Sequence, residues 1–316
     1  MKLFGTLEPF PQEPGSRFEP GVVRGYYLDF RLKAKRPTWP PAWLERAWLY
    51  VGIAQWGLGS FERYVSGDGP EWLDAAGNAG TYLLERQEQR GAHQGGWVHT
   101  TPYPHTFTLR PPWLSGITQG QAASLFVRLY LETDDERFAD AARSALRPLT
   151  IKTSDGGVQA ELDGRGFPEE FPTNPPSFVL NGAIAAFWGQ YDVAVGLRDA
   201  DARRDFAAGA ETLAMNLHRW DTGYWSRYDL YPHRIANLAS PWYHVLHVAQ
   251  LRVMHQLDPR PEFATTAARF EQYAESRASR SRAFASKAAF RVLTPRTGRL
   301  RARLAAGRWR RLLTRR

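Results

Sequence analysis

Apolar residues recur at helical spacing along most of this 316-residue chain, in segments separated by stretches rich in proline and glycine. Phe206, Ala210, Leu213 and Leu217 form one such stripe, which places them on one face of a helix. The pattern predicts a helix that begins at Pro41, because proline suits the first turn. It predicts seven more over residues 71–89, 118–132, 135–146, 177–197, 201–217, 241–257 and 261–277.

Long irregular segments occur at every second connection between these helices. Residues 91–112 and 153–176 are rich in glycine and proline, which predicts hairpins or extended loops. Four helix pairs with such insertions predict a mainly α fold, an α/α toroid of about four helix pairs with β-hairpins or loops at its cleft. An irregular helical bundle is the alternative, because the chain shows no strong internal repeat.

The composition divides the chain into three predicted parts. Residues 1–40 are proline-rich and predict an extended N-terminal segment, in which residues 26–30 could form a short strand. Residues 41–283 hold the helical pattern and predict one domain. Residues 284–316 predict a basic, arginine-rich tail.

The net charge of +9 is concentrated near the C-terminus. Residues 277–316 contain 14 of the 41 Lys and Arg residues and none of the 32 Asp and Glu residues. The other residues therefore carry 27 bases against 32 acids, which makes the body mildly acidic. The tail could bind an anionic membrane as an amphipathic helix, an acidic polysaccharide or a glycosyltransferase, and the alternative is an unstructured extension. The acidic body carries no nucleic-acid-reading module, so nucleic acid is not an expected partner.

The sequence also excludes several classes of protein. The absence of cysteine excludes disulfides, cysteine-ligated zinc and a cysteine nucleophile. No apolar stretch is long enough for a signal peptide or a membrane span, so we expect a cytoplasmic protein, peripheral at the inner membrane face if its tail binds lipid. His93, His99 and His105 are evenly spaced in one loop region but match no zinc pattern, and no metal site is expected.

Side chains suited to acid–base chemistry gather in two segments broken by proline and glycine, residues 168–182 and 225–244. Glu170 lies in a proline-rich turn, Tyr228 in a short loop, and Tyr243 at a predicted helix start. Functional residues are often carried on such loops and element ends. Each residue also has an ordinary interpretation, because paired glutamates are usually solvated and a tyrosine beside a tryptophan usually packs in a core.

These residues belong to a colinear set of motifs. The motifs are GYYLDF (25–30), IAQWGL (53–58), SGITQGQA (115–122), EEFPT (169–173), SFVLNG (177–182), YDL (228–230), NLA (237–239) and YH (243–244). In this order they resemble the catalytic C-terminal domain of the D-glucuronyl C5-epimerases, which invert the uronic acid carbon of heparan-type polysaccharides. A single motif would be a weak signal, but the whole set makes a specific match over about residues 25 to 283.

The resemblance implies an isomerase that converts D-glucuronic to L-iduronic acid in a heparosan-like polymer without a cofactor. Such a reaction needs two acid–base groups flanking the inverted carbon and a cation beside the carboxylate. The resemblance implies that Glu170 and Tyr243 form the catalytic pair and that the phenol Tyr228 is a third catalytic residue. The substrate-binding residues that it implies are Gln119, Phe171, Asn181, Asn237 and His244, and we add Arg234 as a candidate. The family also suggests a homodimer.

Two positions depart from the family pattern. The tyrosine that follows the glutamate pair in the family is Phe171 here, which removes a hydroxyl but leaves Glu170 as the base on that face. The arginine that follows Tyr-Asp-Leu in the family is also missing, and Arg234 is the nearest candidate to bind the carboxylate, ahead of Arg227. The chain lacks the β-rich N-terminal region and membrane anchor of the animal enzymes, so we expect the catalytic domain nearly alone.

Two other functions stay open on the sequence. A polysaccharide lyase would abstract the same proton and then expel the C4 oxygen instead of reprotonating the carbon. A catalytically inactive protein could bind glycans or help to assemble a glycosyltransferase complex through the tail. The loss of the phenol at Phe171 leaves room for both alternatives.

Overall fold

The computed structural model describes residues 19–44 and 49–295, and within these residues the protein is mainly α-helical, as predicted. The helices are α1 (Tyr50–Val65), α2 (Glu71–Leu84), α3 (Gly116–Thr133), α4 (Glu136–Thr150), α5 (Leu180–Gly196), α6 (Ala200–Asn216), α7 (Pro241–Leu257), α8 (Pro261–Glu275) and α9 (Arg277–Leu293). Two short 3-10 helices are η2 (Thr153–Asp155) and η3 (Leu217–Trp220). The strands are β1 (Tyr103–Pro104), β2 (Thr108–Leu109), β3 (Gln159–Leu162) and β4 (Arg165–Pro168).

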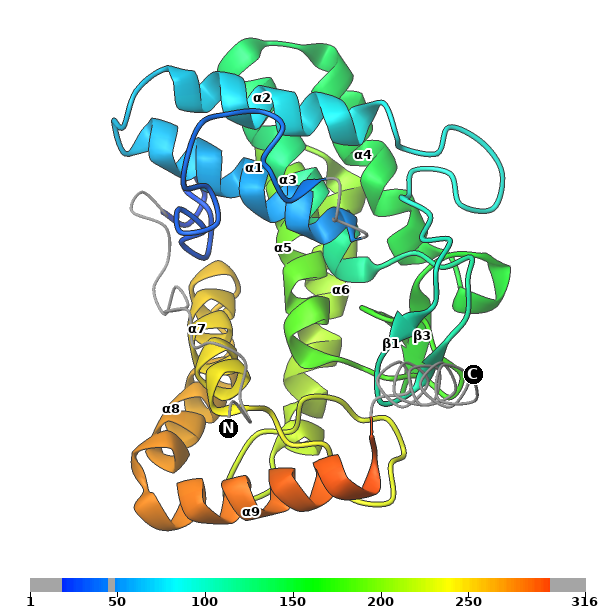
Figure 1. The fold of residues 1–316 in the computed structure, drawn as a ribbon, viewed down its shortest axis with the longest axis vertical. Coiled ribbons are helices and arrows are strands. Elements are labelled where there is room, and N and C mark those ends of the chain that lie inside the picture. Colours follow the sequence, from blue (N-terminus) through cyan, green and yellow to red (C-terminus); the bar gives the residue numbers. More distant parts are fainter. Residues whose placement is uncertain (1–18, 45–48, 296–316) are drawn as a thin grey trace, which may run out of the picture.

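The first eight helices pack as four consecutive pairs, α1 with α2, α3 with α4, α5 with α6 and α7 with α8. The first members of the pairs also pack in succession, α1 on α3, α3 on α5 and α5 on α7. Figure 1 shows α5 near the centre of the molecule, with α1 and α2 at the top and α8 and α9 at the bottom. The helix pairing agrees with the predicted order, and closure of these pairs into a toroid stays a prediction.

Helices α3 and α5 lie unusually close together because glycine faces glycine at their contact. A Cβ atom added to Gly120 would lie 2.2 Å from the carbonyl oxygen of Ala185. One added to Gly189 would lie 2.5 Å from the Cα atom of Gly120. Any side chain at either position would therefore push the two helices apart. This contact lies in the middle of α5 and lets the helix pack closely on α3.

The two long insertions are hairpins, as the glycine and proline content predicted. In the first, Tyr103 pairs with Leu109 and Pro104 with Thr108 in an antiparallel register. In the second, the four residues of β3 pair with those of β4, and the chain then turns into the segment that carries Glu170. Figure 1 places both hairpins on the same side of the molecule, beside the lower half of α5.

Two predicted elements differ in the structure. The first helix was expected from Pro41, but α1 begins at Tyr50, and Trp48 lies outside the described residues. Residues 26–30 are not a strand; they are buried and irregular. The hydroxyl of Tyr27 donates to Asp192 Oδ1 (2.7 Å), and the amide of Tyr26 donates to the Glu62 carboxylate. Hydrogen bonds to helix side chains therefore replace the strand partner that this segment lacks.

Helix α9 packs on the body along one face. Ser276 caps its N-terminus by accepting a hydrogen bond from the amide of Ser279. The buried residues of α9 are Ala283, Lys287 and Phe290, at spacings of four and three. The helix runs across residue 284, the predicted start of the basic tail, while residues 296–316 lie outside the described part of the chain.

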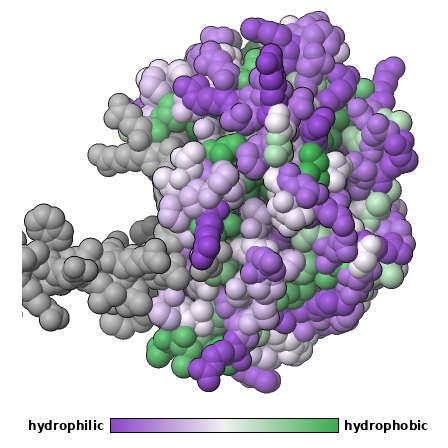
Figure 2. Space-filling model, turned by 90° about the vertical axis from the view of Figure 1, so that its right-hand side faces the viewer, coloured by the Kyte–Doolittle hydropathy of each residue, from purple (hydrophilic) through white to green (hydrophobic). Residues whose placement is uncertain are grey.

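The surface is polar over most of the face that Figure 2 displays, with small apolar areas between hydrophilic side chains. Of the helices in the described residues, none has both the length and the apolar composition needed to cross a membrane.

Candidate active site

A cavity of about 100 Å³ brings together residues from five separate parts of the chain. Its walls come from the β1–β2 hairpin, the turn after β4, the loop before α7, the first turn of α7 and the C-terminal half of α9. Five residues singled out in the sequence line it, namely Glu170, Phe171, Tyr228, Asn237 and Tyr243. The folded chain thus places the predicted catalytic carboxylate and both predicted phenols around one opening.

The side chain of Glu170 lies at the wall of this cavity with only 7% of its surface exposed. Asn181, in the first turn of α5, donates from Nδ2 to Oε2 of Glu170 (3.2 Å). Burial raises the pKa of Glu170 from 4.5 to about 8, the hydrogen bond from Asn181 opposes this rise, and the charge of Glu169 adds to it. A carboxyl group that titrates near neutral pH can donate or accept a proton, so Glu170 is suited to acid–base catalysis.

Its neighbour Glu169 has a different environment and a structural role. The Glu169 carboxylate accepts hydrogen bonds from the amide (2.7 Å) and hydroxyl (2.7 Å) of Ser177 and from the amide of Phe178 (2.6 Å). Burial raises its pKa to about 7 despite these donors. Glu169 therefore ties the turn before α5 to the segment that carries Glu170 and does not line the cavity.

The two phenols come from different elements and contact each other. The rings of Tyr228 and Tyr243 meet edge to face, with their centroids 4.9 Å apart. Ser240 caps α7 by accepting a hydrogen bond from the amide of Tyr243 (3.3 Å), which fixes this residue in the first helical turn. Burial, followed by the charge of Glu170, raises the pKa of Tyr228 well above its usual value.

The position that lacks the family hydroxyl is covered by another phenol. Phe171 is buried in the cavity wall, and the ring of Tyr103 stacks on it with a centroid separation of 5.0 Å and an interplanar angle of 13°. Tyr103 belongs to β1 and lines the cavity together with His105 and Thr106. The hairpin therefore brings a hydroxyl to this wall from a segment in which the sequence had drawn attention only to the histidines.

The three loop histidines diverge in the folded chain. His93 Nδ1 lies 2.8 Å from the carbonyl oxygen of Gly156, and His99 stacks on Trp113. Only His105 lines the cavity. Within residues 19–44 and 49–295, no group of three or more potential ligands among His, Asp and Glu is placed to hold a metal ion.

Three predicted substrate contacts are buried away from the cavity. Both amide hydrogens of Gln119 are used by the carbonyl oxygens of Gly95 (3.0 Å) and Ala145 (2.7 Å). Asn181 contacts Glu170 and so positions that residue. His244 is fully buried, and its Nε2 lies 2.7 Å from the carbonyl oxygen of Phe270, while burial lowers its pKa to about 4. These side chains support the fold around the site.

The arginines proposed from the sequence to bind a carboxylate do not line the cavity either. Arg234 is exposed on the loop before α7. Arg227 is partly buried outside the cavity, and desolvation lowers its pKa. The cations that do line the cavity are Lys287 and Arg291, both on α9. The sequence offered one signal for them, since Ala283 and Phe290 have the spacing of a buried helix face on either side of Lys287.

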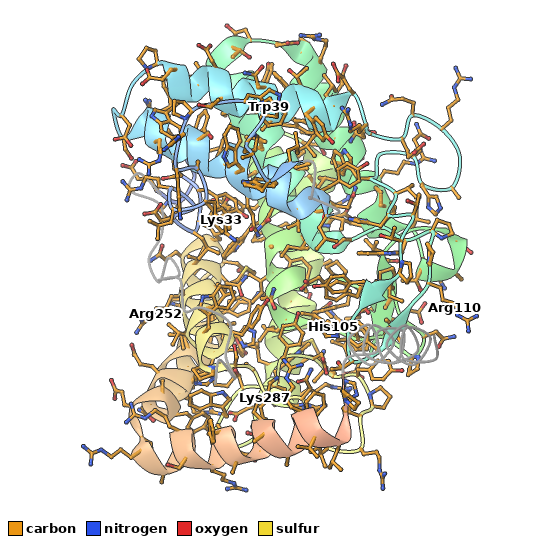
Figure 3. All side chains as sticks on the ribbon, in the orientation of Figure 1. Lys33, Trp39, His105, Arg110, Arg252 and Lys287 are labelled. Carbon is orange, nitrogen blue, oxygen red and sulfur yellow. The ribbon has the colours of Figure 1, made fainter. Side chains whose placement is uncertain are left out.

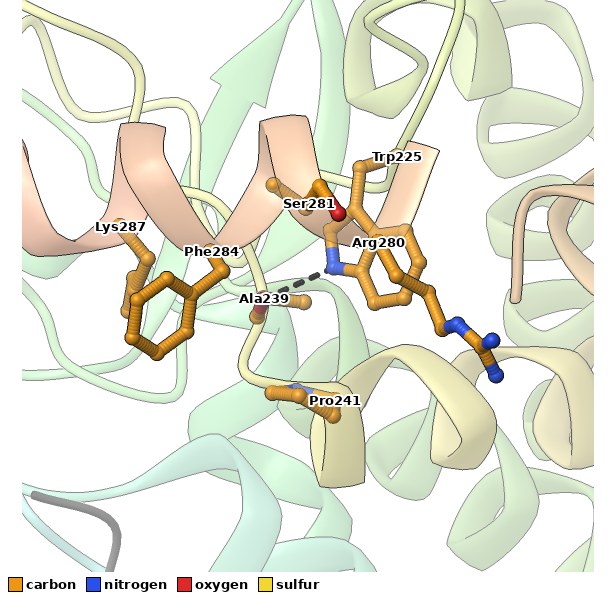
Figure 4. A pocket seen from close by; sticks show the side chains of 8 residues that line it. Trp225, Ala239, Pro241, Arg280, Ser281, Phe284 and Lys287 are labelled. Carbon is orange, nitrogen blue, oxygen red and sulfur yellow. Dashed lines mark hydrogen bonds between the residues drawn. The ribbon is translucent and has the colours of Figure 1, made fainter. Parts of the chain in front are cut away.

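A second cavity, of about 390 Å³, adjoins the first and shares Lys287 with it. It lies between α9 and the start of α7, where Figure 4 shows Pro241 opposite Phe284 and Trp225. The indole Nε1 of Trp225 donates to the carbonyl oxygen of Ala239 (3.0 Å), which leaves the cavity with a mainly apolar wall. Lys287 thus stands between an acid–base cavity and an apolar one.

Fold and site together define a helical-pair domain in which one buried glutamate and three tyrosines converge on a small cavity. A sequence model described as D-glucuronyl C5-epimerase C-terminus matches residues 90–272, more than half of the chain. The protein belongs to this family.

Two relatives show how much of the family this chain represents. A D-glucuronyl C5-epimerase of Caenorhabditis elegans is 31% identical over 214 residues, which cover 62% of this chain and 34% of that protein. An uncharacterised protein of Methanocaldococcus jannaschii is 25% identical over 214 residues, which cover 66% of this chain and 62% of its own length. The matched parts therefore span about one third and somewhat under two thirds of these relatives. Helix α9 lies beyond the family match.

Proposed function

We propose that this protein is a uronate C5-epimerase that converts D-glucuronic to L-iduronic acid residues in a heparosan-like polysaccharide. The observation that carries this proposal is the convergence of Glu170, Tyr228 and Tyr243 on one cavity in a chain of this family. Their positions are separated by 58 and 15 residues in the sequence, so only the fold brings them together. The activity named for the C. elegans relative is an inversion at C5, which these residue types can perform.

The chemistry begins with the hydrogen on C5, next to the substrate carboxylate. A base removes this proton, and the electron pair of the broken C5–H bond passes into the carboxylate to form an enediolate. An acid on the opposite face then donates a proton to C5, the electron pair returns to form the new bond, and the ring carbon is inverted. We assign the two faces to Glu170 and Tyr243, because each lines the cavity from a different element.

The protonation states of the site fit this assignment. With the pKa of Glu170 raised to about 8, roughly a tenth of this group is ionised at pH 7 and able to act as the base. Tyr228, with its pKa raised well above 10, stays a neutral phenol and can donate a hydrogen bond to the developing oxyanion. Tyr228 thus supports the anionic intermediate without exchanging its own proton.

Solvent exchange tests the proposal directly. The purified protein would be incubated with heparosan oligosaccharides in deuterated water, and the uronate C5 position would be followed by NMR. We expect loss of the C5 proton signal together with new iduronate signals, and no change with a folded Glu170→Gln variant. A product that absorbs in the ultraviolet would identify β-elimination and a lyase. Binding without exchange on any uronate polymer would make the protein a glycan-binding member of the family.

A further inference from the structure

Lys287 is buried in the wall of the acid–base cavity although it belongs to the arginine-rich end of the chain. Its Nζ donates to Asn237 Oδ1 (2.7 Å) and to the carbonyl oxygen of Leu238. Asn237 in turn donates from Nδ2 to Asp229 Oδ2 (2.6 Å), and its carbonyl oxygen accepts from the amide of Tyr228 (2.8 Å). The ammonium group is thus attached to the loop that presents Tyr228.

Arg291 follows Lys287 by four residues, so both side chains leave α9 on the same face. Both line the cavity with Glu170 and Tyr243, Lys287 buried in its wall and Arg291 more exposed. Figure 3 shows Lys287 directed into the molecule near His105, whereas Arg110 and Arg252 point outward. A helix that the family match does not include therefore places two positive charges beside the acid–base residues.

Uronate chemistry needs a cation at this place. When the proton leaves C5, the neighbouring carboxylate takes up a second negative charge, and a buried positive group stabilises that charge far more than water-exposed groups do. A guanidinium can hold a carboxylate through two parallel hydrogen bonds, and an ammonium acts as a compact point charge. Among the described residues that line the cavity, the Lys and Arg side chains are Lys287 and Arg291.

We infer that α9 supplies the carboxylate-binding site of the cavity, with Arg291 and Lys287 as the groups that hold the substrate's carboxylate. This inference rests on the proposed function, because it takes the ligand to be a uronate. It assigns substrate selection in this chain to a helix that packs across the end of the matched domain. Arg234 and Arg227, the candidates from the sequence, have no part in it.

A purely structural role for Lys287 makes a different prediction. Its bonds to Asn237 and Leu238 hold the loop in place, so their loss alone would weaken binding of charged and neutral glycans alike. A carboxylate-binding role would weaken binding of the charged glycan only. The ratio of the two affinities therefore separates the two roles.

The experiment compares two ligands, a heparosan oligosaccharide and the same oligosaccharide with its carboxyl groups reduced to hydroxymethyl groups. Their dissociation constants would be measured by titration calorimetry for the wild type, Arg291→Gln and Lys287→Met. Arg277→Gln is the matched control, because Arg277 is an exposed residue of the first turn of α9 away from the cavity. Arg291→Gln removes a charge from an exposed side chain, so it keeps the test valid even if Lys287→Met does not fold.

We expect Arg291→Gln and folded Lys287→Met to lose affinity for the uronate ligand by roughly 10- to 100-fold, the size of a hydrogen bond to a charged group. The affinity of Arg291→Gln for the reduced ligand, and both affinities of Arg277→Gln, should stay at the wild-type value, whereas Lys287→Met should lose more affinity for the uronate ligand than for the reduced one. The inference would be overturned if Arg291→Gln prefers the uronate ligand as strongly as the wild type does, or if it loses affinity equally for both ligands.

The two proposals fail in distinguishable ways. If the wild type exchanges the C5 hydrogen for deuterium but the variants still prefer the uronate ligand as the wild type does, the proposed epimerase activity stands and the role of α9 is wrong. If the wild type prefers the uronate ligand through Arg291 but shows no C5 exchange, the carboxylate-binding role of α9 stands and the epimerase activity is wrong.

Discussion

Gly182 in the first turn of α5 lies directly against the side chain of Glu170. A Cβ atom at position 182 would be 2.4 Å from Glu170 Oε2 and 2.5 Å from Glu170 Cβ. The hydrogen bond from Asn181 holds the same carboxylate from the neighbouring position of the helix. The first turn of α5 therefore positions Glu170 in two ways. Gly182 leaves room for the Glu170 side chain, and Asn181 supplies a hydrogen bond to it.

The variant Gly182→Ala tests this contact. The new methyl group cannot fit without moving the rigid Cβ atom of Glu170, so the carboxylate should shift away from the reacting carbon. We expect C5 exchange to fall by about 100-fold and stability by roughly 1–3 kcal/mol. Gly77→Ala in α2 is the control, since a Cβ atom there meets nothing within 4 Å. That change should leave exchange intact and raise stability by up to about 1 kcal/mol.

The pH dependence of kcat/KM reports the protonation state of the free site. Because inversion needs one proton shared between the two catalytic groups, both directions of the reaction depend on the same protonation state. With the pKa of Glu170 at about 8, kcat/KM should rise about tenfold per pH unit below that value and level off above it. A profile that is flat from pH 5 to 8, measured with either epimer, would contradict the role of Glu170 as the base.

Thermal unfolding gives an independent test of the same carboxyl group. The folded-state pKa of Glu170 is raised above the ordinary 4.5. The favourable contribution of this carboxyl group to the free energy of unfolding is therefore complete below about pH 4.5 and is lost as pH rises toward 8. Glu170→Gln keeps a neutral side chain at every pH. The Tm of this variant should therefore exceed that of the wild type increasingly between pH 5 and pH 8. Glu136→Gln, at an exposed position of α4, is the matched control.

The sequence allowed the helical class and both hairpins to be predicted from local spacing, and its motifs pointed to Glu170, Tyr228 and Tyr243, which line one cavity. It did not predict the cations, because the relation of Lys287 to Glu170 arises only when α9 folds across the body. Gln119 and His244, also named from the motifs, have polar atoms that contact backbone groups in the core. A motif shows that a polar residue matters for the fold or the site, but packing decides which.

The buried ion pair between Arg128 of α3 and Asp192 of α5 organises the N-terminal segment. Their atoms Nη1 and Oδ2 are 2.7 Å apart, and Arg128 Nη2 also donates to the carbonyl oxygen of Gly25 (2.7 Å). Arg128→Met would leave Asp192 buried without its partner and should cost about 3–5 kcal/mol of unfolding free energy. Arg137→Met removes an exposed ion pair with Asp135, and we expect its Tm to equal that of the wild type. If Arg128→Met and Arg137→Met had the same Tm, this account would be contradicted.

Tyr243 and Tyr228 touch, yet the proposed mechanism gives them separable roles. In Tyr243→Phe the ring and its edge-to-face packing on Tyr228 are kept, but the acid on one face of the sugar is lost. Glu170 can still remove a proton and return a deuteron to the same face. Inversion should therefore fall by about 100- to 10,000-fold, the contribution of a general acid, while one epimer still exchanges its C5 hydrogen.

Tyr228→Phe should lower exchange and inversion together, by about 100- to 1,000-fold, because it removes a donor to the shared intermediate. NMR of glucuronate and iduronate oligosaccharides in deuterated water measures both quantities in one sample. If Tyr243→Phe lowers exchange of both epimers as much as it lowers inversion, Tyr243 acts on the intermediate and another group must protonate the second face. Tyr103, stacked on Phe171 in the cavity wall, would then be the next phenol to replace.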